Sequence, residues 1–475
     1  MGKQLRDVLF LLAVLSWTGC TFDISGPHAL VGEGDSAPLL FPDSGEGYRD
    51  GLSRDGLQFS DATVDGGPAD TQPDVLGLDT RVDTTPMGCV NCGLLGCNET
   101  LKRCNRLAPS NIPLALVETL HGESLADCSI TQSGEADGAK GIFGDCRPQG
   151  SEHSTREGVY WGSVMMPGNR LVTLFAMNSL TIDRDTVLRG MGSDPILIYA
   201  REGITIHGLI DVGAQLGVAG PGGGKGGEFD GASGEACEGG EGGGGDRTNE
   251  IFGDKSGGGG GGWGQRGAGG GWAASIPGGV GGELPLSSTT LSLVPLRGGC
   301  GGGAGGGSFK DGGPGGAGGG AIQLSAGTTL IVDGEGIYAA GGGGGGGHET
   351  DAGGGGGSGG SILLESVEVH VTAATPITAN GGGGGAGGPE GLAGASGEDG
   401  IHDVSRADGG VAVYPTGSGG AGGAIWHLPG AGGYSSHAGG GGGGMGRCRI
   451  RARVSLVSSQ LLSPRLTSDI KLSVW

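Results

Sequence analysis

Short segments in which apolar and polar residues alternate are the most regular feature of the second half of this chain. Leu180-Thr-Ile182 and Ile204-Thr-Ile206 follow this pattern and lie 24 residues apart, and the same interval separates Leu188 from Val212. Alternation with a period of two predicts β-strands. Its recurrence at a fixed interval predicts that successive segments stack as coils of a parallel β-solenoid.

A longer interval relates the segments nearer the C-terminus. Three pairs of apolar residues are each 40 residues apart: Ile322 and Ile362, Leu324 and Leu364, and Ile337 and Ile377. We therefore expect two further copies of the repeat, with a fourth, degenerate copy at 447–456 closing the stack. Arg449, Arg451 and Arg453 alternate with apolar residues in that copy, which predicts a solvated strand face. A binding stripe is the alternative.

Glycine fills the intervals between these copies. Continuous runs begin at the ends of the predicted coils, at 341–347, 353–357, 381–385 and 439–444, and longer glycine-rich inserts occupy 217–282 and 298–320. Elsewhere glycine takes every third position, at Gly388, Gly391, Gly394, Gly397 and Gly400 and at Gly417, Gly420 and Gly423.

Three residues per turn is the period of the polyproline-II helix, in which a glycine edge lets neighbouring backbones approach closely. We expect the runs to pack as laterally hydrogen-bonded polyglycine-II strands. Their edges are expected to be covered by aromatic residues, namely Trp263, Trp272, Phe309, Trp426 and Tyr434. Disordered glycine is the alternative, because glycine loses more backbone entropy on ordering than any other residue.

The composition limits what the chain can be. Of 475 residues, 120 are glycine and 21 are proline, and aromatic residues make up only 4%, so a conventional hydrophobic core can occupy only a minority of the chain. The formal net charge is −22 at pH 7. Because phosphate binding depends on clustered Lys and Arg, the sequence argues against a nucleic-acid partner.

Residues 1–19 have the pattern of an export signal. Lys3 and Arg6 precede an apolar stretch at 8–15 that is too short to span a bilayer. The ending Leu15-Ser16-Trp17-Thr18-Gly19-Cys20 resembles a bacterial lipobox, which implies lipidation of Cys20. By resemblance to bacterial sorting rules, Thr21 implies an outer-membrane destination. Secretion without a lipid is the alternative.

Residues 20–86 are rich in Asp, Gly, Pro, Ser and Thr and contain no lysine. Their acidic residues repel one another, and their apolar residues follow neither the strand nor the helix period. This segment is therefore predicted to be an extended, disordered tether.

Residues 87–150 form a small Cys-rich segment that contains Cys89, Cys92, Cys97, Cys104, Cys128 and Cys146. The first four have short spacings that would suit a zinc knuckle, but export to an oxidising compartment favours disulfides. Cys237 and Cys300 complete the set of candidate disulfide cysteines. The chain has 10 cysteines, so once Cys20 is set aside one of the others should remain unpaired.

The sequence contains no convincing catalytic or metal motif. Gly356-Gly-Ser358-Gly-Gly360 has the spelling of a nucleophile elbow, but it lies in a glycine run without α/β alternation. The cluster at 348–351 is interpreted as an exposed loop rather than a metal site. Asp-Gly pairs at 311, 333, 399 and 408 offer oxygen ligands for structural calcium, yet Asp-Gly is itself a turn signal, and turns are favoured. We therefore expect no cofactor.

One combination of features resembles a known group of proteins. The lipobox, the acidic tether, the Cys cluster, strands such as Ile204-Thr-Ile-His-Gly-Leu-Ile-Asp-Val212 and runs such as Leu293-Val-Pro-Leu-Arg-Gly-Gly-Cys-Gly-Gly-Gly-Ala-Gly-Gly-Gly307 are similar to the glycine-rich predicted surface lipoproteins of myxobacteria. The likeness covers most of the chain and implies an envelope location and a β-solenoid more than an activity. A purely compositional resemblance is to phage fibre adhesin tips that contain polyglycine-II bundles, and it carries over no binding residues.

These features predict an all-β protein with a short parallel β-helix and inserted polyglycine-II-like segments over 151–475. The expected function is a structural or adhesive role without catalysis. We expect a lipid anchor to hold the protein at the outer membrane or cell surface, and a surface glycan or protein to be its ligand. The alternative is a secreted or periplasmic β-helix enzyme, a polysaccharide lyase or hydrolase, which rests on fold analogy.

Overall fold

The computed structural model describes residues 95–98, 103–215, 217–228, 230–235, 237–248, 253–285, 287, 291–308, 312–457 and 462–464. They belong to one compact unit, Asp79–Trp475. Their regular structure is mostly sheet, with the single helix α1 (Leu114–Gly122) among the described residues, and the prediction of an all-β fold is confirmed. The predicted signal, tether and lipidation site at Cys20 lie outside this part of the chain. No helix within it is long and apolar enough to cross a membrane.

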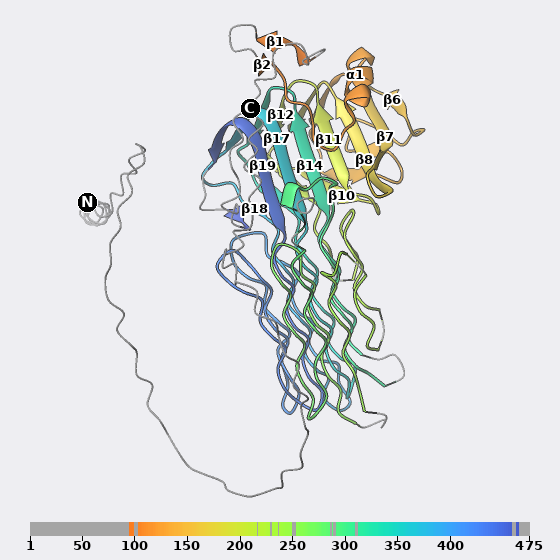
Figure 1. Ribbon diagram of the computed structural model, residues 1–475, viewed down its shortest axis with the longest axis vertical. Helices are drawn as coiled ribbons and strands as arrows, with labels where there is room; N and C mark the ends of the chain where they lie inside the picture. The colour runs from red at the N-terminus through yellow and green to blue at the C-terminus, as the bar shows by residue number, and fades with distance from the viewer. Residues whose placement is uncertain are drawn as a thin grey trace, which may run out of the picture. The chain divides into compact units, whose positions relative to one another are not determined.

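The parallel strands line up in three rows, the first of which faces the viewer in Figure 1. The first row comprises β8 (Arg170–Met177), β11 (Ile196–Ala200), β14 (Ala321–Ala326) and the first halves of β17 (Ser361–Val371) and β19 (Arg447–Val457). The second row comprises β3 (Asp127–Ile130), β9 (Ser179–Ile182), β12 (Ile204–Ile206), β15 (Thr329–Val332) and the second halves of β17 and β19. The third row comprises β4 (Gly134–Asp137), β10 (Val187–Met191), β13 (Leu209–Asp211), β16 (Gly336–Tyr338), β18 (Ile377–Thr378) and β20 (Leu462–Ser463). On each pass the chain visits the rows in this order.

Most of the predicted strand pairs occur in the predicted register. Leu180 pairs with Ile204, Ile322 with Ile362, and Ile337 with Ile377. The predicted match of Leu188 with Val212 is wrong, because Leu188 pairs with Ile210. Four residues join β9 to β10 but only two join β12 to β13. Partners in β10 and β13 are therefore two residues closer along the chain than partners in β9 and β12.

Antiparallel strands complete the N-terminal end of the sheets. β5 (Ile142–Phe143) pairs with β4, and β6 (Ser154–Arg156) and β7 (Val159–Met166) extend the first row beyond β8. A separate pair consists of β1 (Cys97–Asn98) and β2 (Arg103–Cys104). Because β3 and β4 belong to the same rows as later strands, the sheets continue across the predicted boundary at residue 150.

The three rows enclose one apolar core, and other segments cover the outer face of the first row. Ile322 and Leu324 point into the core that all three rows share. On the outer face, α1 buries Val117 and Leu120 against β8 and β11. Further along that face, Leu293 and Leu296 pack on β14 and β17, so both faces of the row are shielded from water.

The predicted solvated arginine face of β19 is wrong. The Arg451 side chain is 14% exposed, lies 3.2 Å from a carboxylate oxygen of the fully buried Glu365, and donates to the Ala108 carbonyl. Arg449 donates to the Ser292 carbonyl, and burial lowers its pKa. The segments around Ala108 and Ser292 cover this face, which the sequence pattern could not show.

Between circuits the chain leaves the sheets in long glycine-rich segments, which we call excursions. Every excursion begins after a third-row strand and ends before a first-row strand. They follow the third-row strands β13, β16 and β18, and they return at the first-row strands β14, β17 and β19. In Figure 1 they run side by side from the strands to the opposite end of the unit and back. Segments from different parts of the sequence are thus gathered into one glycine-rich bundle.

Candidate functional site

The middle of the glycine bundle is held together by backbone hydrogen bonds with a period of three residues. Along the segment 353–360, the amides of Gly353, Gly356 and Gly359 donate to carbonyls of one neighbouring segment at 438–444, over 2.8 to 2.9 Å. The intervening residues donate to other segments in the same way. Each successive amide therefore points about a third of a turn further round the segment, as a three-residue helical period requires.

This segment has six neighbours in all. Its amides donate to 438–444, 339–345 and 300–303, and its carbonyls accept from 258–261, 316–319 and 382–385. Some of these neighbours run parallel to it and others antiparallel. Because every amide from Gly353 to Gly360 has a backbone acceptor, the segment satisfies its N–H donors although it is buried.

Segments at the edge of the bundle show why glycine recurs at every third position there. Gly394, Gly397 and Gly400 donate to Gly347, Gly344 and Gly341 respectively. Ala395, Ser396 and Glu398, which lie between them, are exposed. Only the inward position must be glycine, whereas a segment surrounded on all sides needs an almost continuous run.

The far end of the bundle consists of turns, and one group of turns displays aromatic side chains. Trp272, Tyr414 and Tyr434 are 56%, 95% and 72% exposed. Ser435 holds the three turns together, because its amide donates to the Trp272 carbonyl and its hydroxyl to the Pro415 carbonyl. We call Trp272, Tyr414 and Tyr434 the tip trio.

The prediction that aromatic residues cover the edges of the bundle is therefore wrong for most of those named. Trp272, Trp426 and Tyr434 project into solvent from turns at the bundle ends. Trp263 is 1% exposed and packs between the bundle and the sheets. Phe309 lies outside the described residues. Turns place side chains outward, because the closely packed glycine segments between them have no room for rings.

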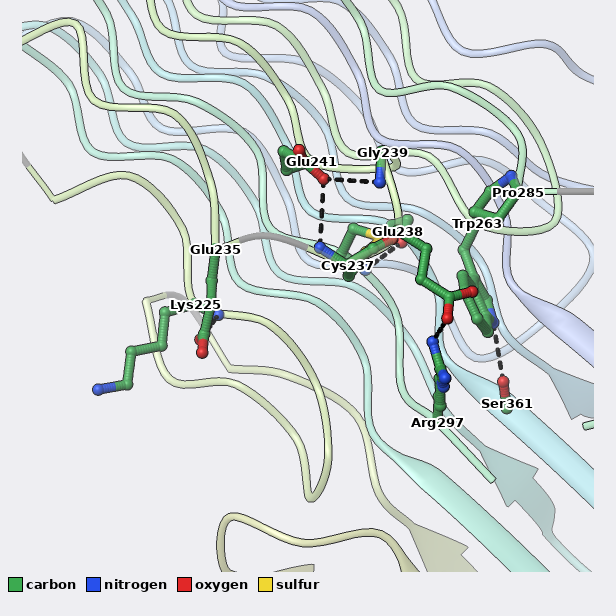
Figure 2. Close-up of a disulfide and its surroundings, with 12 residues drawn as sticks. Lys225, Glu235, Cys237, Glu238, Gly239, Glu241, Trp263, Pro285, Arg297 and Ser361 are labelled. Carbon is green, nitrogen blue, oxygen red and sulfur yellow. Dashed lines mark hydrogen bonds and ion pairs between the residues drawn. A yellow bond between two sulfur atoms is a disulfide. The ribbon is translucent and has the colours of Figure 1, made fainter. Parts of the chain in front are cut away.

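The junction between bundle and sheets is built around Trp263 and a disulfide (Figure 2). The Trp263 indole donates to the Ser361 hydroxyl over 2.8 Å, and Arg447 lies over its ring and donates to its carbonyl. Close by, Cys237 is bonded to Cys300. Glu238 on the same turn forms an ion pair with Arg297, whose pKa is lowered to about 10 by burial and then by the charge of Arg170.

A cavity of about 320 Å³ opens at this junction. Its lining includes Arg170, Asp194, Glu235, Arg297 and Trp263. Burial raises the pKa of the Asp194 carboxyl. The cavity lies at the small end of the range of about 300 to 1,000 Å³ that is usual for ligand sites. The sequence did not suggest it, because its residues come from the β7–β8 hairpin and from five other places along the chain, at 193–195, 222–224, 235–237, 263 and 296–299.

The candidate disulfide cysteines fall into three groups. Cys128 is bonded to Cys146, and Cys237 to Cys300. Cys97 and Cys104 are also disulfide-bonded, whereas Cys89 and Cys92 lie outside the described residues. Within the described part of the chain Cys448 is free and buried, and burial raises its pKa to about 12.

Two of the aspartates in the Asp-Gly pairs considered for calcium are engaged by the protein itself. Asp399 accepts a hydrogen bond from the Gly343 amide, and Asp333 pairs with His207. The prediction of a turn holds at Asp333 but is wrong at Asp399 and Asp408, which lie in extended segments of the bundle. Asp311 lies outside the described residues. Among the residues that the structure describes, no group of three His, Cys, Asp or Glu side chains could hold a metal ion.

Comparison of the chain with protein families, with curated proteins and with solved structures finds no match.

Proposed function

We propose that the strands form a short parallel β-solenoid and that the glycine segments form a polyglycine-II lattice. The three in-register rows support the solenoid, because the chain passes through them in the same order on every circuit. The six neighbours of the segment 353–360 and its three-residue period support the lattice. Each excursion then consists of two or more lattice strands. All of them project from the solenoid between its third and first rows.

We further propose that the protein is a cell-envelope lipoprotein with a structural or adhesive role at the cell surface and without catalysis. The observation that carries this proposal is the hydrogen-bonded interior of the bundle, in which every amide from Gly353 to Gly360 has a backbone acceptor. At about 3.1 Å per residue, an eight-residue run spans about 25 Å, so the bundle is a stiff projection that presents its end turns at a fixed distance from the sheets. A lipid on Cys20 and the acidic tether would hold this projection away from the outer membrane, where a surface glycan or protein is available as ligand.

The tip trio is the expected contact surface. Replacing Trp272, Tyr414 and Tyr434 together with serine should reduce surface attachment and cohesion of the native host cells by about tenfold or more, because exposed aromatic residues contribute most of the binding energy of contact surfaces. The melting temperature of the variant should be nearly that of the wild type, because exposed side chains contribute little to stability. The assay compares a deletion strain complemented with wild-type or variant chain.

Trp426→Ser is the matched control, because Trp426 is 64% exposed but lies in a turn at the sheet end of the bundle, where the Ile425 amide donates to the Ser463 hydroxyl. Its attachment should equal that of the wild type. If deletion of the whole protein leaves attachment and cohesion unchanged, the adhesive role is untenable.

The cavity at the junction favours a second candidate function, a glycan-processing enzyme. A carboxyl whose pKa is raised, as burial does for Asp194, suits general acid catalysis. If the protein depolymerises any member of a panel of acidic and neutral polysaccharides, Asp194→Asn should lower the rate by about 100-fold or more. If the wild-type protein cleaves none of these polysaccharides, the proposal of a glycan-processing enzyme is wrong.

A further inference from the structure

The far end of the glycine bundle buries a lysine against an aspartate. Lys255 Nζ lies 3.0 Å from Asp351 Oδ1, and the two side chains are 0% and 5% exposed. Nζ also donates to the Thr350 carbonyl over 2.8 Å, and Oδ1 accepts from the Ser308 amide. The two residues belong to different excursions of the chain, and their neighbours fix the amine against the carboxyl group.

Burial makes this pair unusual. Two ions withdrawn from water lose hydration free energy, and their mutual attraction offsets only part of that loss. By contrast, the pair between Lys140 and Asp137 leaves Lys140 54% exposed, so that its ammonium remains hydrated. A neutral product would relieve the cost at Lys255 and Asp351, and the surrounding glycine backbone keeps out the water that would reverse its formation.

A histidine stands beside the lysine. His437 and Lys255 are partners in a parallel bridge, in which the Lys255 amide donates to the Ser436 carbonyl and the Ala438 amide to the Lys255 carbonyl. His437 Nδ1 is buried without a hydrogen-bond partner in the described part of the chain. Burial, and then the charge of Lys255, lower the pKa of His437, which favours the neutral imidazole, in which the unpartnered Nδ1 can act as the proton acceptor.

We propose that Lys255 and Asp351 are joined by an intramolecular amide bond, with His437 moving the proton. Loss of one proton from the ammonium to the imidazole frees the Nζ lone pair, which attacks Cγ of Asp351. The Nζ–Cγ bond forms and a Cγ–O bond breaks. The departing oxygen takes one proton from the imidazolium and one from Nζ and leaves as water.

The reaction balances without any further reactant. An ammonium and a carboxylate become a neutral amide and one molecule of water, and nothing is oxidised or reduced. Nζ lies 3.0 Å from Oδ1, and Oδ1 is bonded to Cγ, so a small movement brings the amine to the attack distance of about 3 to 3.5 Å from that carbon. The bond would link residue 255 in the first glycine excursion to residue 351 in the second, and so close the far end of the bundle covalently.

Peptide mapping of the full-length, reduced chain tests the proposal. Trypsin should leave Lys255 uncut and release peptide 248–266 covalently attached to peptide 311–406, lighter than their sum by one water molecule. Lys255→Ala and Asp351→Ala should each release separate peptides, and His437→Phe should lower the linked fraction in freshly folded protein. The Lys140 and Asp137 pair, in which the lysine is 54% exposed, should remain unlinked and serves as the internal control.

If wild-type protein whose glycine amides are protected from exchange yields only separate peptides, with Lys255 cleaved, the proposal is wrong. That result is read from the wild type alone, so it holds even if the variants fail to fold. It is also independent of adhesion, because a linked chain that does not adhere contradicts only the proposed function.

Discussion

Gly355→Ala is expected to lower the free energy of unfolding by about 3 kcal/mol or more, at the upper end of the cost of overpacking. Gly355 is surrounded by other segments, and a Cβ built on it would lie 2.1 Å from the Gly259 carbonyl oxygen and 2.4 Å from the carbon of that group. Both atoms are backbone, and no side-chain rotation can relieve the contact. Thermal or denaturant unfolding of the purified variant measures the loss.

Gly269→Ala is the matched control within the same bundle. Its Cβ would meet nothing closer than the Gly279 carbonyl oxygen at 3.7 Å, which is an ordinary contact. Replacing glycine by alanine where the backbone permits it restricts the unfolded chain and should stabilise the protein by about 0.4 to 1 kcal/mol. Equal effects at the two positions would mean that the bundle is not packed as described.

Loss of the disulfide between Cys237 and Cys300 should be the other large effect. The bond closes a loop with a sequence separation of 63, and loop-closure entropy gives about 4 kcal/mol for that length. The loop is glycine-rich, and glycine has the most conformational freedom to lose. Stability of the Cys237→Ala, Cys300→Ala double variant, measured against wild type without reductant, tests this value.

The bond between Cys128 and Cys146 provides the comparison. Its sequence separation is 18, for which the same entropy gives about 3 kcal/mol. The double variant at Cys237 and Cys300 should therefore lose more stability than the one at Cys128 and Cys146. The reverse order would show that the glycine loop is already restricted in the unfolded chain.

The sequence was sufficient for the repeating strands because their signal is local and periodic. The intervals of 24 and 40 residues reappear as the pairs Leu180 with Ile204 and Ile322 with Ile362. It was insufficient where a turn changed length, as between Leu188 and Ile210. A two-residue change in a connection leaves no mark on the alternation of the strands that it joins.

The surroundings of individual side chains were harder to predict. Arg449 and Arg451 alternate as a solvated face would, yet segments remote in sequence cover them. The tip trio is drawn from turns at 272, 414 and 434, which only the folded bundle brings together around Ser435. Lys255 and Asp351 are likewise paired only by the folded bundle, and the prediction that the cluster at 348–351 is an exposed loop is wrong at Asp351, which is 3% exposed.

Amide hydrogen exchange, resolved by residue, tests most directly the claim that the glycine segments form an ordered lattice. The amides at 353–360 should be protected as strongly as those of β14. At the edge of the bundle, Gly394, Gly397 and Gly400 should be protected, while Ala395 and Ser396, which donate no backbone hydrogen bond within the described part of the chain, should exchange quickly. Exchange of all these glycines at the rates of an unfolded chain would contradict the lattice and the stiff projection built on it.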